Sequence, residues 1–128
     1  MTAPAFNTVA WFQVGTDDPA GAKRFYGELF GWTFTQDPGA GGAYDLVHYG
    51  DSPQPNGGIA DISGGGATGK HAIFLVVVED VPAALAKAEQ LGGKVLVPAT
   101  TSPDGLVFAH VLDPSGNEFG LFTPPQAG

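Results

Sequence analysis

The sequence predicts an α+β domain made of two copies of one βαβββ unit, and three observations lead to this prediction. Apolar segments typical of strands flank two segments whose apolar residues recur at helical spacing. Each helical segment begins at an aspartate suited to capping and ends at a glycine. A shift of 62 residues carries Asp18 to Asp80, Gly31 to Gly93 and His48 to His110. An internal repeat is the most economical account of one shift that matches caps, helix ends and late strands.

The first unit is expected over residues 6–62. Residues 8–15 (TVAWFQVG) form its first strand, and Asp18 followed by Pro19 begins a helix that ends at Gly31. Three strands follow, at residues 32–36, 44–49 and 58–62, with a Pro/Gly-rich loop before the last. The spacing of the apolar helix residues predicts one buried face, which consists of Ala22, Phe25, Tyr26, Leu29 and Phe30.

The second unit repeats this order over residues 71–123, after a glycine-rich linker at residues 63–70. A strand at 71–78 leads to a helix that Asp80 caps and that Gly92 and Gly93 close. Strands at 94–100, 105–112 and 118–122 complete the unit. The segment Asp113–Asn117 is expected to be a structural turn, because Asp and Asn make local side-chain turns and Gly supplies a positive φ.

Composition bounds the class of protein. The 128 residues fit a single domain (1–128), and 43% hydrophobic with 14% charged residues indicates a globular chain. The net charge of −8 and only five scattered Lys and Arg residues argue against nucleic-acid binding. The absence of cysteine excludes a thiol nucleophile and thiolate ligands, and no apolar run is long enough to span a bilayer. A cytoplasmic location is expected.

The motifs of both halves resemble those of a known family. The chain resembles the first half of the vicinal oxygen chelate superfamily at Asp17-Asp18-Pro19, Phe25-Tyr26 and Leu29-Phe30-Gly31-Trp32. It resembles the second half of that superfamily at Leu91-Gly-Gly-Lys-Val and Asp113-Pro-Ser-Gly-Asn. That superfamily includes glyoxalase I, bleomycin-resistance proteins and extradiol dioxygenases. The resemblance implies the glyoxalase/bleomycin resistance/dihydroxybiphenyl dioxygenase-like fold, in which two βαβββ modules form a half-open barrel around a concave cleft. It does not fix the reaction, because one fold hosts many chemistries.

The resemblance also implies where a metal would be held. Metal-using members carry one ligand on the first strand and one on the last strand of each module, and these positions fall on Trp11, Gly58, Ile73 and Gly120. An indole offers only a donor, and Ile and Gly offer no ligand atom. We therefore expect neither a metal nor another cofactor in the cleft.

Strand alternation then predicts which side chains line the cleft, if Trp11 and Ile73 face it. The predicted ligand-binding residues are Trp11, Gln13, Tyr44, Leu46, His48, Ile73, Leu75, Phe108 and His110. The opposite set, which includes Phe12, Val14, Phe74 and Val76 and the third-strand residues Val107, Ala109 and Val111, faces the helices. In the first half this assignment turns Asp45 toward a helix.

His48 and His110 are the candidate acid–base residues, although a ligand contact or a structural role is favoured over catalysis, because neither is assigned a partner carboxylate. Glu118, close to a turn, is expected to be solvated, and His71, at a strand start, to be exposed.

Three functions remain open. The leading one is metal-independent binding of a small neutral or aromatic molecule in an aromatic, cation-poor pocket, comparable to sequestration by bleomycin-resistance proteins. The second is a glyoxalase-like lyase or isomerase, and the third a vestigial pocket with a protein-interaction role. The exposed sheet edges favour a homodimer.

Overall fold

The computed structural model describes residues 5–37, 43–64 and 69–125, and within them the tandem βαβββ order is confirmed. The first module contains strand β1 (Thr8–Thr16), helix α1 (Pro19–Phe30) and strands β2 (Thr33–Gln36), β3 (Tyr44–His48) and β4 (Pro55–Asp61). The second contains β5 (His71–Val77), α2 (Val81–Gln90), β6 (Lys94–Thr101), β7 (Val107–Leu112) and β8 (Glu118–Thr123). The expected linker falls partly outside the described residues, which omit 65–68.

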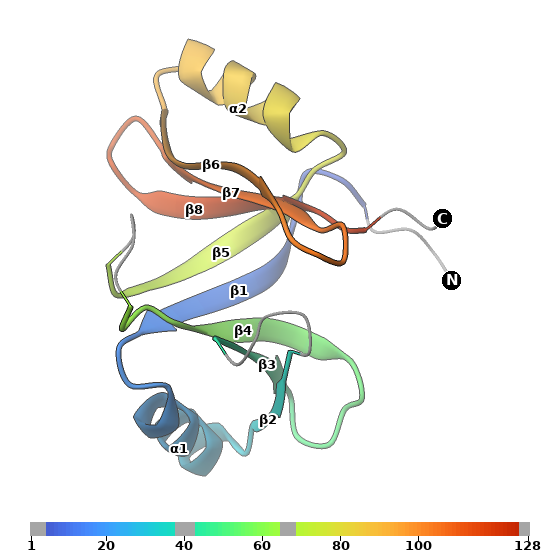
Figure 1. Ribbon diagram of the computed structural model, residues 1–128, viewed down its shortest axis with the longest axis vertical. Helices are drawn as coiled ribbons and strands as arrows, with labels where there is room; N and C mark the ends of the chain where they lie inside the picture. The colour runs from blue at the N-terminus through green and yellow to red at the C-terminus, as the bar shows by residue number, and fades with distance from the viewer. Residues whose placement is uncertain (1–4, 38–42, 65–68, 126–128) are drawn as a thin grey trace. The chain divides into compact units, whose positions relative to one another are not determined.

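The chain forms two compact units, Met1–Ala10 with Ile73–Gly128 and Trp11–Ala72. The first three residues of β1 therefore belong to the unit that contains most of the second module, and the rest of β1 belongs to the other unit. The start of β5, including His71, belongs to the unit that contains most of the first module. In one unit β3 pairs with β2 and β4 in antiparallel fashion, and β4 pairs with β1 in parallel. In the other, β8 lies between antiparallel β7 and parallel β5, and β6 pairs with β7 (Figure 1).

The helix caps follow the sequence. Asp18 accepts a hydrogen bond from the Gly21 N–H and Asp80 from the Ala83 N–H, each at 3.1 Å. Gly31 ends α1 with a φ of 74°, a left-handed conformation that side chains other than glycine rarely adopt. The cap of each module thus satisfies a backbone donor that the first turn of a helix leaves without a partner. None of the helices within the described residues is long and apolar enough to cross a membrane.

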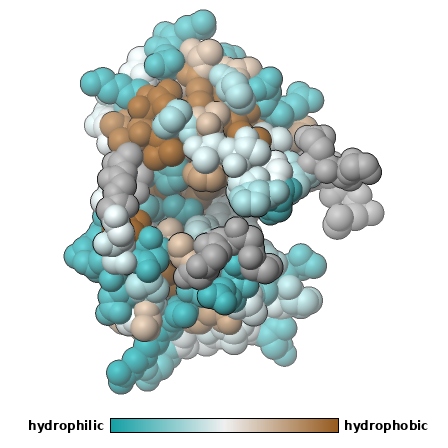
Figure 2. Space-filling view, in the orientation of Figure 1, coloured by the Kyte–Doolittle hydropathy of each residue, from teal (hydrophilic) through white to brown (hydrophobic). Residues whose placement is uncertain are grey.

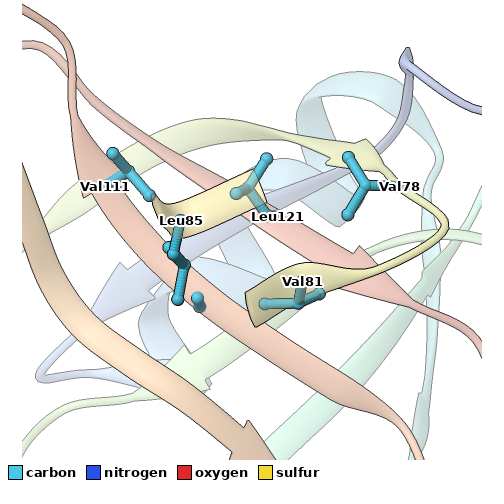
Figure 3. Packing of buried hydrophobic residues seen from close by; sticks show 6 residues of the cluster. Val78, Val81, Leu85, Val111 and Leu121 are labelled. Carbon is cyan, nitrogen blue, oxygen red and sulfur yellow. The ribbon is translucent and has the colours of Figure 1, made fainter. Parts of the chain in front are cut away.

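The aliphatic core of the second module lies between α2 and the sheet. Val81 and Leu85 of α2 point toward Val111 of β7 and Leu121 of β8 (Figure 3). Ala109 and Val111 are buried, as expected for helix-facing residues of the third strand. Burial of each such Val or Leu side chain contributes roughly 1.5–3 kcal/mol. The opposite faces of β7 and β8 are thereby left for other contacts.

Helix α1 lacks the buried face that the sequence predicts. It contains no buried residue, and Phe25, Leu29 and Phe30 are more than half exposed. The sheet side next to α1 carries large rings instead of small aliphatic groups. Trp32 lies 5.4 Å from Phe12, 5.6 Å from Tyr26 and 5.5 Å from Tyr49 between ring centroids. Tyr26 of α1 stacks on Trp32 at an interplanar angle of 20°, and the helix leaves part of its apolar surface uncovered.

Hydrophobic atoms also reach the surface elsewhere. Figure 2 shows a mainly hydrophilic surface with brown, hydrophobic atoms grouped at the level of β6 and β8. In the same module Phe74 is about half exposed and stacks on Phe119 at a centroid distance of 5.8 Å. Exposed aromatic groups of this size are typical of surfaces that another molecule covers.

Candidate functional site

The strand registers of the first module separate two faces of its sheet. Gly58 of β4 lies opposite Gln13 of β1 and Leu46 of β3, so these three residues share one face. Tyr44 is on the same face, two residues before Leu46. We call the set Trp11, Gln13, Tyr44, Leu46 and Gly58 the first-module face. Asp45 points to the other side, where its carboxylate lies 3.4 Å from Lys23 Nζ of α1.

A chain of hydrogen bonds runs across the first-module face. Trp11 Nε1 donates to Tyr44 Oη at 3.0 Å, and Tyr44 Oη donates to Gln13 Oε1, also at 3.0 Å. The other end of the Gln13 amide lies 3.1 Å from His71 Nε2. The half-buried Gln13 amide thus has a partner on each side, and its partner His71 is also half-buried.

Two glycines make room for the rings of this network. A Cβ placed on Gly58 would fall onto the ring of Tyr44, and one on Gly15 would fall onto the imidazole of His71. The Tyr44 and His71 rings therefore lie flat against the sheet where side chains are missing. Gly57, on the opposite side of β4, gives the same space to Phe12.

Burial of the Tyr44 ring changes the acidity of its hydroxyl. Desolvation, partly offset by the hydrogen bond from Trp11 and reinforced by the charge of Asp37, raises the pKa of Tyr44 to about 12. The group therefore keeps its proton at physiological pH. It serves as a hydrogen-bonding hydroxyl and not as a phenolate base.

His48 is held by residues of its own module. Its Nε2 lies 2.9 Å from Thr35 Oγ1 of β2, and its Nδ1 lies 3.0 Å from the Ser52 carbonyl oxygen. The ring is buried, and the strand register shifts between Val47 and His48. Because one ring nitrogen contacts β2 and the other contacts the β3–β4 connection, these contacts favour a structural role for this candidate.

The second module carries its own polar group on the face that points away from α2. Gly120 of β8 lies opposite His110 of β7 and Leu75 of β5, and Phe108 lies opposite Phe122. Ile73 is two residues before Leu75 and has the same parity. We call the set Ile73, Leu75, Phe108, His110 and Glu118 the second-module face.

His110 has a carboxylate partner that sequence reasoning missed. Its Nδ1 lies 2.9 Å from Glu118 Oε2, and the two side chains are only 6% and 17% exposed. Glu118, the first residue of β8, is therefore shielded rather than solvated, because it has the parity of Gly120 and its carboxylate contacts His110. His71 likewise has the parity of Ile73, but parity along one strand does not show its contact with Gln13 on another strand.

The side chains at the four positions where the resemblance implies metal ligands offer no ligand atom for a metal ion. The ring of Tyr44 covers Gly58, and the Tyr44 hydroxyl accepts a hydrogen bond from the Trp11 indole N–H. A Cβ on Gly120 would lie 2.6 Å from Leu75 Cγ, so an apolar side chain occupies that space. In the part of the chain that the structure describes, no three His, Cys, Asp or Glu side chains gather closely enough to hold a metal ion. The residues present at these positions do not fit the ion.

Comparison with known proteins defines the class. The chain belongs to the Glyoxalase/Bleomycin resistance protein/Dioxygenase superfamily, whose family model matches residues 8–121. It is 32% identical over 119 residues to "Putative glyoxylase CFP32" of Mycobacterium tuberculosis, covering 90% of this chain and 45% of that protein. It is 34% identical over 142 residues to "Anthracycline biosynthesis protein DnrV" of Streptomyces peucetius, covering 95% of this chain and 49% of that protein. The chain thus spans about half the length of these relatives.

Solved structures with the same fold include methylmalonyl-CoA epimerases. The enzyme from Mycobacterium tuberculosis matches with a TM-score of 0.64 at 14% identity, over 98% of this chain and 94% of that one. A Streptomyces coelicolor epimerase variant matches with the same TM-score at 15% identity, over 96% of this chain and 100% of that one. At this level of identity the likeness establishes the fold and leaves the chemistry open.

Proposed function

We propose that this protein binds a small, neutral, planar molecule without a metal, in the manner of a sequestering protein. One observation carries the proposal. The Tyr44 ring covers Gly58, and the Trp11 indole is held beside it by a hydrogen bond, so aromatic surface occupies a position where relatives place a ligand of the metal. Aromatic rings held in fixed orientations favour stacking with a planar ligand.

Charge supports the same ligand class. The first-module face that we propose to bind the ligand includes neither Lys nor Arg. Phosphonate and carboxylate ligands are normally met by such cations, and a net charge of −8 repels anions further. The kinship with a protein named for anthracycline biosynthesis also supports a fused-ring aromatic ligand, since anthracyclines contain one. We further propose a cytoplasmic location and a homodimer for this protein.

Tryptophan fluorescence tests the proposal, because the two tryptophans lie on opposite sides of the first sheet. We expect 1-naphthol to quench the protein and to raise its Tm, and the quenching to persist in Trp32→Phe and disappear in Trp11→Phe. Treatment with a chelator should leave binding unchanged. Tighter binding of 1-naphthalenesulfonate than of 1-naphthol, or a requirement for a divalent ion, would contradict the proposal.

A second candidate function is favoured by the His110–Glu118 pair. A carboxylate that accepts from Nδ1–H fixes the tautomer and the orientation of the imidazole, as in acid–base catalysis. Such a pair could move a proton beside a carbonyl group, as a lyase or isomerase requires. We expect deuterium from D₂O to enter an α-carbon of a ketone or thioester substrate. Loss of about 10²–10⁴-fold of that rate in Glu118→Gln would support catalysis, and an unchanged rate would exclude this pair from it.

A further inference from the structure

The hydrogen bonds around Gln13 have a defined direction. His71 Nδ1 lies 2.7 Å from the carbonyl oxygen of Gly69, and a carbonyl only accepts, so Nδ1 carries the hydrogen. In a neutral imidazole the other nitrogen, Nε2, is then an acceptor. It faces the Gln13 amide nitrogen at 3.1 Å, which donates to it. The Gln13 amide oxygen consequently points to Tyr44.

This direction fixes what the Tyr44 hydroxyl can offer. Its single hydrogen is directed to Gln13 Oε1, at 3.0 Å. The indole N–H of Trp11 can only donate, so it uses one lone pair of Tyr44 Oη. The oxygen has one further lone pair, which can accept one more hydrogen bond. A molecule that meets this hydroxyl must therefore donate a hydrogen bond.

We propose that this network gives the first-module face a hydrogen-bond polarity, so that it selects aromatic molecules carrying an N–H or O–H donor, and that protonation of His71 reverses this preference. The inference rests on the proposed function, because it concerns the ligand of the same face. It names the ligand class more narrowly, as a planar aromatic donor. The high pKa of Tyr44, about 12, keeps the hydroxyl protonated in both states.

The reversal follows from the geometry of the amide. A protonated His71 donates from both nitrogens, so Gln13 must turn its oxygen toward Nε2 and its NH₂ group toward Tyr44. Tyr44 Oη then accepts from both Trp11 and Gln13, and its own hydrogen becomes available to a ligand. The face now favours a molecule that accepts, such as a ketone.

Several charged or titratable groups surround the switch. Asp18, Tyr26 and Lys70 line a hollow of about 470 Å³ together with His71, and Lys70 Nζ lies 3.6 Å from Asp17 Oδ2. On the other side of the network, Asp37 acts on Tyr44. The direction of the reversal is set by the donors and acceptors of the network itself.

Two probes of similar size and opposite polarity test the inference. Indole carries an N–H donor, and 1-indanone carries only a carbonyl acceptor; their Kd values are measured by ligand-observed NMR at pH 8 and pH 5.5. At pH 8 we expect indole to bind about fivefold more tightly than 1-indanone, a ratio that corresponds to one neutral hydrogen bond. At pH 5.5 this ratio of Kd values should fall or invert. In Gln13→Leu, which removes the amide between His71 and Tyr44, the ratio should not change with pH.

The outcomes separate this inference from the proposed function. If both probes bind with a ratio that is the same at both pH values and in Tyr44→Phe, the polarity is absent, while aromatic binding stands. If neither probe binds, the proposed function fails and the polarity with it. The ¹⁵N shifts of the His71 ring give an independent measurement on the unmodified protein. They should show the Nδ1–H form at pH 8, and an Nε2–H form would overturn the inference.

Discussion

Glycines at two positions on the first-module face determine where its aromatic side chains can lie. Tyr44 rests over Gly58 and His71 over Gly15, and a Cβ at either glycine would occupy the volume of a ring. Both glycines belong to paired strands, where glycine is normally unfavourable. The cost of placing glycine in a strand is offset here by close ring-to-backbone packing and by the hydrogen bonds that this packing permits.

Replacement of Gly58 by alanine tests this packing. The added methyl group forces Tyr44 away from the sheet and from Trp11 and Gln13, so we expect Gly58→Ala to lower the free energy of unfolding by about 1–3 kcal/mol. Chemical denaturation measures the change. Gly64→Ala is the matched control, because an added Cβ there meets nothing within 4 Å. Equal stability of the two variants would show that Tyr44 does not rely on Gly58.

At the scale of secondary-structure elements, local signals predicted most boundaries. The caps at Asp18 and Asp80 and the helix end at Gly31 are found where the sequence places them. Strand β4 differs, since it begins at Pro55, three residues before the expected start at Gly58. Its Pro-Asn-Gly-Gly composition is typical of a loop, but Gly57 and Gly58 are required beneath Phe12 and Tyr44. Long-range packing therefore decided a boundary that local propensity could not.

The same contrast holds for the candidate site. Strand parity alone predicted that Val107, Ala109 and Val111 face α2 and that Gln13 lies on the other side of its strand from Phe12. It could not reveal the contacts of Gln13 with His71 or of His110 with Glu118. Each of these pairs joins side chains from different strands, and their meeting depends on register and on neighbouring glycines rather than on sequence spacing.

The turn between β7 and β8 gives a prediction that depends on pH. The backbone N–H and side chain of Asn117 donate to Asp113 and hold the pKa of its carboxyl below the usual range. A carboxyl with a lowered pKa in the folded state stabilises the protein above its unfolded pKa, and this contribution disappears as the pH falls through the folded value. Asp113→Ala should therefore be less stable than the wild type at pH 7, and the difference should shrink below about pH 4.

Thermal or urea unfolding between pH 2.5 and 7 measures this effect. Asp113→Asn is the matched variant, because an amide oxygen still accepts from the turn but carries no charge that titrates. It should fall between the wild type and Asp113→Ala at pH 7. A difference between the wild type and Asp113→Ala that stays constant over the whole range would rule out an electrostatic contribution from the turn.

At the scale of the whole molecule, the chain spans 45–49% of the length of relatives to which it is 32–34% identical. Those relatives are long enough to contain a second domain of the same size. A second copy of this chain could supply an equivalent partner, as isologous dimers do. Helix α1 offers the surface for it, because Phe25 and Leu29 are 61% and 58% exposed beside the Arg24–Glu28 ion pair. Two antiparallel copies of α1 would bring opposite charges together along the rim of this apolar surface.

We therefore expect sedimentation velocity to give twice the chain mass of 13.1 kDa, and the double substitution Phe25→Ser, Leu29→Ser to reduce it to a single chain. Truncating apolar side chains at the centre of an interface typically costs more than 1 kcal/mol each, enough to shift a micromolar dimer by more than tenfold. Leu91→Ser is the matched control, because Leu91, the C-cap residue of α2, is 68% exposed and corresponds by the repeat to Leu29 of α1. If Leu91→Ser dissociates the dimer and the α1 variant does not, the interface lies at the end of α2 and not at α1. A wild-type mass equal to one chain would exclude the dimer.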